Sequence, residues 1–299
     1  MSAILPIRYV EPVFRPPSEA ESLILPVTDG CSWNKCTFCE MYTAPQKQFR
    51  ARDEAEVIDS IRRTGERFGG QIRRVFLADG DALVLPARRL LAYLEAIRIY
   101  LPAVHRVSTY CLARNLKKKT VAELETLAAA GLKLAYLGAE SGDDEVLTRI
   151  DKGESFESTR EALDKLGEAG ITRSVMILNG LGGQALSERH ADNSARLANA
   201  TQPEYLSTLV VTLHNQGTRF LGAWPDWKSL TQDGLFREME RFLSALELER
   251  TVFRSDHASN WLVLKGTLGA DKDRLLAQVR AAIEHPEEAP LRPAWMRGL

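Results

Sequence analysis

The chain has 299 residues, of which 44% are hydrophobic and 26% are charged. This length suits one large α/β domain, or one domain with an appendage, and the hydrophobic content can fill a sizeable core. The formal net charge of −1 gives no electrostatic reason to expect a nucleic-acid partner. No stretch reaches about eighteen uncharged apolar residues, and no signal peptide is recognised, so we expect no membrane span and a cytoplasmic location.

A cluster of cysteines follows the first apolar run of the chain. Residues 1–21 contain several prolines and predict an extended lead-in, and Leu23–Val27 predicts the first strand. Cys31, Cys36 and Cys39 come next, spaced C-x4-C-x2-C. Three thiolates in one loop need a soft metal centre to hold them. They supply one ligand fewer than the four-cysteine set of common iron–sulfur and zinc sites. A four-iron cluster held by this loop would therefore keep one iron open to a reactant.

Strand-like and helix-like segments then alternate about six times with short connections. Asp53 with Glu56 and Thr120 with Glu123 predict two helix starts. The expected strands are 23–27, 74–78, 106–110, 133–138, 172–178 and 205–212. This alternation requires parallel strands joined by helical crossovers. Six repeats are too few for a closed eightfold barrel, and they fit either an open barrel or a doubly wound sheet.

The position of the unusual residues favours the barrel. The unusual residues are all expected at the carboxyl ends of strands: the cysteines, Asp79 and Asp81, Ser108 and Tyr110, Glu140 and Ser141, and Gly180. In a barrel these ends converge on one mouth, where active sites are built. We therefore predict a partial (β/α)6 TIM-type barrel over residues 22–220. From Leu221 onward the rhythm changes, and 221–299 predicts a C-terminal helical extension that covers the mouth.

The cysteine triad, with Phe38 just before the last cysteine, resembles the cluster loop of the radical S-adenosylmethionine superfamily. The usual spacing there is C-x3-C-x2-C, whereas Ser32–Lys35 make four intervening residues here. The resemblance implies that the three cysteines hold a [4Fe–4S] cluster whose open iron chelates S-adenosylmethionine (SAM). One electron would then split SAM into methionine and a 5′-deoxyadenosyl radical. A partial (β/α)6 barrel is also known for this superfamily.

Two further motifs resemble those that bind SAM in this superfamily. Asp79-Gly80-Asp81 occupies the place of a Gly-Gly-Glu motif that receives the methionine ammonium, and only Gly80 is identical. An ordinary Asp-Gly turn is the alternative. Leu137–Gly142 resembles a fourth-strand segment of coproporphyrinogen-oxidising and tRNA-modifying members. There a Glu accepts hydrogen bonds from the ribose, which assigns that role to Glu140, with Ser141 assisting. The alternative is a Glu that caps the next turn.

The remaining cofactor contacts implied by the resemblance are weaker. Met176–Gly183 resembles a fifth-strand segment that lays an apolar side chain, here Leu178, against adenine. Phe38 would border the same adenine, with core packing as the alternative. Arg173 could reach the methionine carboxylate or could be a surface arginine. Ser108 is a second ribose candidate, with core packing equally compatible.

The predicted function is that of a radical SAM enzyme that takes hydrogen from an unidentified small-molecule or peptide substrate. A flavodoxin or ferredoxin would donate the electron. His214, Asn215, His257 and Asn260 are candidate substrate contacts, or else structural hydrogen-bonding groups. Cys111 is expected to be a buried inert thiol, with a fourth ligand or a substrate-facing thiol as alternatives. The rival function is a non-catalytic α/β protein that binds zinc or an iron–sulfur centre.

Overall fold

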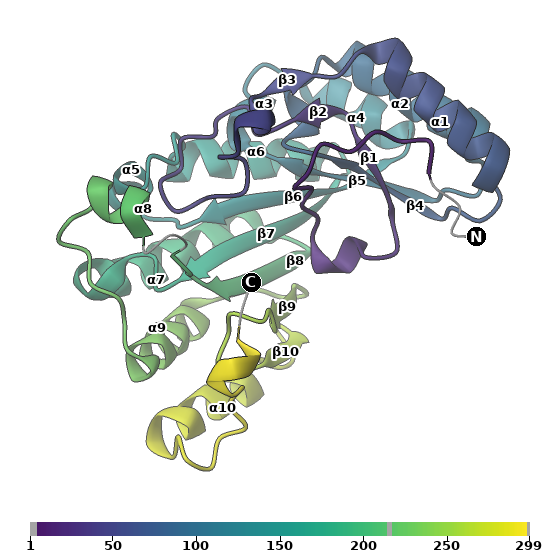
Figure 1. The fold of residues 1–299 in the computed structure, drawn as a ribbon. Helices are drawn as coiled ribbons and strands as arrows, with labels where there is room; N and C mark the ends of the chain where they lie inside the picture. The colour runs from purple at the N-terminus through teal and green to yellow at the C-terminus, as the bar shows by residue number, and fades with distance from the viewer. Residues whose placement is uncertain (1–4, 214–216, 298–299) are drawn as a thin grey trace. The chain divides into compact units, whose positions relative to one another are not determined.

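The computed structural model describes residues 5–213 and 217–297. The chain divides into two compact units. The first unit comprises Met1–Asn34, Cys39–Leu137 and Asp164–Thr172. The second unit comprises Lys35–Phe38, Gly138–Leu163 and Arg173–Leu299. Each unit is built on parallel strands joined by helices (Figure 1).

The parallel strands of the first unit follow the chain order. They are β1 (Leu23–Pro26), β4 (Arg74–Ala78), β5 (Arg106–Cys111) and β6 (Leu132–Glu140), whose last residues belong to the second unit. The crossover helices are α1 (Glu54–Phe68), α2 (Ala87–Tyr100) and α4 (Val121–Ala129), and α1 packs against α2 (Figure 1). The shorter elements are η1 (Pro17–Glu19), β2 (Thr28–Asp29), η2 (Pro45–Lys47), β3 (Arg50–Ala51), η3 (Ala82–Val84) and α3 (Ala113–Leu116).

Two helix starts in this unit form as the sequence predicts. Asp53 caps α1 by accepting a hydrogen bond from the amide of Glu56. Thr120 and Glu123 form the reciprocal pair of a capping box at the start of α4. Each cap satisfies amide groups that have no partner inside the helix. Local chemistry therefore sets these two boundaries.

The N-terminal lead-in is packed onto the first unit rather than left in solvent. Glu19 is fully buried, and its carboxylate lies 2.9 Å from Arg106 on β5. The Tyr136 hydroxyl on β6 donates to the same carboxylate at 2.6 Å. Nearer the start of the chain, the Tyr9 hydroxyl donates to the Ile24 carbonyl of β1 at 2.9 Å. The extended segment is thus held by partly buried polar contacts to three strands.

The second unit contains β7 (Thr172–Asn179), β8 (Tyr205–Val210) and β9 (Val252–Ser255) in parallel, with β10 (Leu264–Thr267) antiparallel to β9. Its helices are α5 (Asp144–Arg149), α7 (Gly183–Thr201), α8 (Thr218–Ala223), α9 (Gln232–Ala245) and α10 (Lys272–Glu284); η5 is Ala294–Met296, and α6 (Phe156–Glu168) has residues in both units. Figure 1 shows α9 beside α7 and α10.

The region after Leu221 contains the expected helices and two strands that the sequence did not reveal. β9 adds a further parallel strand beside β8, and β10 turns back along it. Phe253 and Ser255 are buried while Arg254 is exposed, so β9 does alternate. Four residues are too few for that pattern to stand out from a loop. Within the described residues, no helix has both the length and the apolar content to cross a bilayer.

Candidate cofactor site

The predicted cluster ligands of the cysteine loop are thiols. All four cysteines of the chain are described, and none is in a disulfide. Cys31, Cys36 and Cys39 are partly exposed, whereas Cys111 at the end of β5 is buried. The burial of Cys111 agrees with the prediction of an inert thiol. Three accessible thiols therefore lie in one nine-residue segment.

Two glycines fix the backbone that leads into Cys31. Gly30 has φ +77°, and a Cβ placed on it would lie 2.1 Å from the Lys47 carbonyl oxygen. Gly80 has φ +112°, and a Cβ there would lie 1.9 Å from the Gly30 carbonyl oxygen. No side chain fits either position, and the left-handed backbone also favours glycine. The residue before Cys31 is therefore packed directly between the Lys47 and Gly80 backbones.

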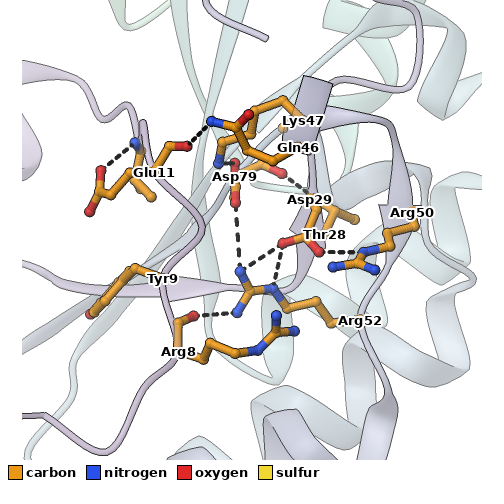
Figure 2. A network of polar contacts seen from close by, with 12 residues as sticks. Arg8, Tyr9, Glu11, Thr28, Asp29, Gln46, Lys47, Arg50, Arg52 and Asp79 are labelled. Atoms are coloured by element: carbon orange, nitrogen blue, oxygen red, sulfur yellow. Dashed lines mark hydrogen bonds and ion pairs between the residues drawn. The ribbon is translucent and has the colours of Figure 1, made fainter. Parts of the chain in front are cut away.

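A buried network of charges surrounds the same backbone (Figure 2). Lys47 Nζ lies 2.6 Å from Asp79 Oδ1, and neither side chain is exposed. The Arg52 guanidinium forms ion pairs with two carboxylates, at 2.7 Å from Asp29 Oδ1 and 3.7 Å from Asp79 Oδ2. Thr28 also donates its hydroxyl to the Asp79 carbonyl at 2.6 Å. Charges this deep are tolerated only when they are paired, so these residues hold β2 and the end of β4 together.

The pKa values of the two buried carboxylates of this network are shifted in opposite directions. Burial raises the pKa of Asp79, and the ion pair with Lys47 offsets only part of that rise. Burial would also raise the pKa of Asp29, but hydrogen bonds from Arg50 and Arg52 outweigh it and leave that pKa lowered. Asp79 Oδ2 also lacks a hydrogen-bond partner among the described residues. The predicted ammonium-binding motif thus keeps one acceptor atom, on Asp79.

Asp81 is bound to the cysteine loop itself. Its oxygens accept hydrogen bonds from the Ser32 amide at 2.7 Å, the Ser32 hydroxyl at 2.5 Å and the Asn115 side chain at 2.7 Å. Burial raises the pKa of Asp81, against the effect of these donors. Because Ser32 follows Cys31 directly, Asp81 fixes the backbone beside Cys31. Its role in binding an ammonium stays a prediction.

The extra residue of the C-x4-C spacing is held by contacts in the first unit. The Arg114 guanidinium lies 3.6 Å from the centre of the Trp33 ring. Asn34 adopts a left-handed φ of 49°, and its side chain donates to the Tyr42 carbonyl at 2.8 Å. Asn tolerates this backbone better than most residues. The longer spacer is therefore an ordered turn.

In the second unit, Glu140 ends β6 with a carboxylate that is only half satisfied. Its backbone is left-handed, with φ 65°, and its side chain is 6% exposed. Lys152 Nζ lies 3.0 Å from Oε1, while Oε2 has no hydrogen-bond partner among the described residues. A buried acceptor without a donor costs free energy, and backbone strain of this kind gathers at functional sites. Glu140 therefore offers a vacant acceptor to a ligand hydroxyl.

Ser141 is committed to contacts inside the fold. Its hydroxyl oxygen accepts a hydrogen bond from the Asp143 amide at 3.0 Å and lies 2.8 Å from His190 Nδ1. The side chain is fully buried. The assisting role in ribose binding stays a prediction, and these two contacts disfavour it.

Phe38 and Leu178, the two predicted adenine contacts, lie in one hydrophobic cluster of the second unit. Leu178 belongs to its buried part, and Phe38 packs against it. The amide of Thr37 donates to the Ile150 carbonyl at 2.9 Å, which anchors the loop beside Phe38. The other buried members are Val146, Leu147, Ile150, Leu181, Phe220 and Trp224. An apolar surface suited to a base is thus present.

Arg173 and Ser108 lie away from the carboxyl ends of their strands. Arg173 is near the start of β7, where it forms a 2.7 Å ion pair with Glu204 and donates to the Thr201 carbonyl. Ser108 is buried in the middle of β5, opposite Phe76 of β4. Their cofactor roles stay predictions, and for Arg173 the ion pair at the far end from Leu178 disfavours one.

The candidate substrate residues that can be located hold the loop after β9. Asn260 accepts from the Val210 amide at 2.9 Å and donates to the Thr208 carbonyl at 2.8 Å. His257 Nδ1 lies 2.9 Å from the Ser259 hydroxyl, and burial and then Arg292 lower the pKa of His257. His214 and Asn215 lie outside the described residues. Substrate contact by these residues stays a prediction.

A comparison with protein families decides the family. The family model described as the radical SAM superfamily matches residues 25–193 of the 299. The chain belongs to the radical SAM superfamily. No curated protein matches it. Members use a [4Fe–4S] cluster and SAM, so this radical SAM protein is an enzyme with these cofactors.

Solved structures of other radical SAM enzymes share its fold at low sequence identity. Coproporphyrinogen III oxidase from Escherichia coli is 15% identical with a TM-score of 0.56, over 75% of this chain and 52% of that one. Methylornithine synthase is 15% identical with a TM-score of 0.53, over 91% and 74%. The methyltransferase TsrM from Kitasatospora setae is 19% identical with a TM-score of 0.52, over 64% of this chain and 36% of that one. The likeness confirms the predicted fold class, a partial TIM-type barrel with a C-terminal extension.

The donor set fits the cluster of this superfamily, because cysteine thiolates are the usual protein ligands of iron–sulfur clusters. The cysteines of a four-iron cluster each bind a different iron and need not converge on one ion. Cys31, Cys36 and Cys39 are the thiols available to hold such a cluster.

The sequence missed the residues that support this radical SAM site. Lys47, Arg52 and Asn115 contact the predicted motifs, but each contacts a partner far away in the sequence. His190 and Glu238 were likewise missed. Nothing in the sequence around Lys47 indicates that it is buried. One usable signal was Gly30 directly before Cys31, because a glycine there can mark a close approach of two backbone segments.

Proposed function

We propose that this enzyme cleaves SAM reductively and uses the resulting radical to take hydrogen from a small-molecule or peptide substrate. When bound, the cluster and SAM supply the hard chemistry, which is one-electron cleavage to methionine and a 5′-deoxyadenosyl radical. The protein's residues bind, orient and shield these groups. A flavodoxin or ferredoxin would deliver the electron.

The observation that carries this proposal is the vacant oxygen of Glu140. Oε2 is buried at the end of β6 and has no hydrogen-bond partner among the described residues, while Lys152 neutralises the other oxygen. A ribose offers hydroxyl donors, and a carboxylate can accept from them. The Glu140 side chain would therefore orient the nucleoside of SAM.

The other contacts divide between apolar and polar groups. Phe38 and Leu178 would border the adenine, because both belong to one apolar cluster. Asp79 would receive the methionine ammonium through Oδ2, which accepts no hydrogen bond and lies 3.7 Å from Arg52, while Gly80 allows close approach of the backbone. Asp81 would act through Ser32 by holding the loop that carries Cys31. We retain residues 1–21, 22–220 and 221–299 as lead-in, barrel and extension, with the extension closing over the substrate.

The direct test is SAM cleavage by anaerobically reconstituted enzyme. With dithionite and SAM, the wild-type enzyme should form 5′-deoxyadenosine and methionine in equal amounts, measured by mass spectrometry. Cys36→Ala should abolish both products and lower the bound iron. Cys111→Ala is the matched control, because it removes a buried thiol outside the loop, and it should retain both iron and activity. Equal product from wild type and Cys36→Ala would refute the proposal.

A further inference from the structure

A chain of buried polar contacts in the second unit links the ends of β6 and β7. Ser141 Oγ lies 2.8 Å from His190 Nδ1 on α7. His190 Nε2 lies 3.9 Å from Glu238 Oε1 on α9. That oxygen accepts a hydrogen bond from the Gly180 amide at 2.6 Å. Ser141, His190 and Glu238 are each at most 3% exposed. The chain therefore runs through the protein interior.

One set of hydrogen-bond directions is compatible with all the partners. The Asp143 amide donates to Ser141 Oγ, so the serine hydroxyl can donate to His190 Nδ1. With these directions the His190 proton lies on Nε2, which faces Glu238 at 3.9 Å, beyond hydrogen-bond distance. Glu238 accepts from the Gly180 amide through Oε1 and from the Ser187 hydroxyl through Oε2 at 2.6 Å. This assignment lets every member act as a donor or acceptor without conflict.

The order serine, histidine, carboxylate is also that of a hydrolytic triad, but the geometry excludes that use. Ser141 is fully buried and already takes a hydrogen bond from the Asp143 amide. A nucleophile must reach its substrate. The chain therefore holds structure in place and attacks nothing.

What it holds are the two strand ends that the proposed function assigns to the nucleoside. Ser141 directly follows Glu140, whose Oε2 is vacant. Gly180 follows Leu178 by two residues and has φ +83°. Its amide would lie buried without a partner if Glu238 were removed. The network thus fixes the position of the ribose acceptor and of the adenine-binding strand end together.

We propose that His190 and Glu238 are positioning residues for the nucleoside of SAM. The inference rests on the proposed function, because it takes Glu140 and Leu178 as nucleoside contacts. Glu238 lies beyond residues 25–193, the part that matches the family model. The C-terminal region of this chain therefore helps to build the cofactor site, and it does so through α9.

The test compares variants of Glu238 in reconstituted enzyme. Glu238→Leu removes the acceptor of the Gly180 amide and should weaken SAM binding about tenfold or more. Glu238→Gln keeps an acceptor oxygen for Gly180 and should stay within about threefold of wild type. Glu240→Gln is the matched control on α9, since Glu240 pairs with Arg280 at the surface, and it should bind SAM as wild type does. Dissociation constants come from calorimetric titration of the oxidised, iron-loaded enzyme, which does not cleave SAM.

A second readout separates positioning from general support of the fold. In Glu238→Leu, the affinity for 5′-deoxyadenosine should fall by the same factor as the affinity for SAM. In Glu238→Gln, the bound iron and the melting temperature should stay at wild-type values. The electron paramagnetic resonance spectrum of the reduced cluster, frozen at saturating SAM, should match that of the wild type. If Glu238→Leu does not fold, His190→Gln and Glu238→Gln together provide the test, and the double variant should bind SAM several-fold more weakly than wild type.

Two results would overturn the inference. One is wild-type affinity for SAM in a folded, iron-loaded Glu238→Leu or double variant. The other is a loss of affinity that appears only in step with lost iron and lowered melting temperature. A wild-type enzyme that binds SAM but forms no 5′-deoxyadenosine would instead refute the proposed function and leave the positioning role standing.

Discussion

Asp81 of the first unit and Glu140 of the second differ in how completely their strand-end carboxylates are satisfied. In the first unit, Asp81 accepts three hydrogen bonds, whereas Asp79 pairs with Lys47 through Oδ1 and has no hydrogen bond to Oδ2. In the second unit, Glu140 uses one oxygen for Lys152 and leaves the other without a partner. A saturated carboxylate builds the protein, whereas a half-satisfied one is prepared for a ligand. Similar motif positions therefore serve different tasks.

The largest effect on stability should follow from removing the buried cation that pairs with Asp79. Lys47→Met leaves the Asp79 carboxylate buried without its cation, and should lower the free energy of unfolding by about 3–5 kcal/mol. Chemical denaturation of the anaerobic protein measures this. Arg50→Met is the control, because Arg50 pairs with Asp29 from an exposed position and should cost less than about 1 kcal/mol. Equal losses in the two variants would contradict the buried-pair interpretation.

The two oxygens of Glu140 can be separated by a pair of variants. Glu140→Gln should weaken SAM binding by roughly 10- to 100-fold, because a charged acceptor is lost, and should also destabilise the fold by removing the negative charge beside Lys152. Adding Lys152→Met should restore stability without restoring affinity. Calorimetric titration and denaturation are the measurements. Recovery of SAM affinity in the double variant would show that Glu140 acts only through Lys152.

Acid should weaken the network of the first unit through Asp29. Its pKa is lowered in the folded state, so its ionisation stabilises the fold above the unfolded value of 3.8 and is lost as pH falls below the folded value. Asp29→Asn should be about 2 kcal/mol less stable than wild type near pH 6, with the difference shrinking below pH 4. Denaturation from pH 6 to pH 3 measures this. A difference that is constant with pH would refute the account.

The smallest expected effect is on SAM affinity when Arg173 is replaced. Its guanidinium is engaged by Glu204 at the start of β7, five residues before Leu178. Because a strand rises about 3.3 Å per residue, it lies on the order of 17 Å along β7 from the apolar contact. Arg173→Met should therefore change SAM affinity by less than about twofold. A tenfold loss would instead assign Arg173 to the methionine carboxylate.

The sequence was sufficient wherever the information was local. The caps at Asp53 and Thr120 form, the strand–helix alternation is present, and the cysteine loop marks the family. It was insufficient where a contact joins distant residues. Lys47 meets Asp79 across 32 positions and Gly180 meets Glu238 across 58. Neither lysine nor glutamate shows burial in a sequence pattern, and β9 is too short to show its alternation.

The central claim is that the protein supplies three ligands to the cluster and leaves the fourth position for SAM. Mössbauer spectroscopy of the ⁵⁷Fe-reconstituted wild-type enzyme, with and without SAM, tests it most directly. The account predicts that SAM changes the signal of one iron in four and leaves the other three as they were. A spectrum indifferent to SAM, with all four irons equivalent, would contradict it.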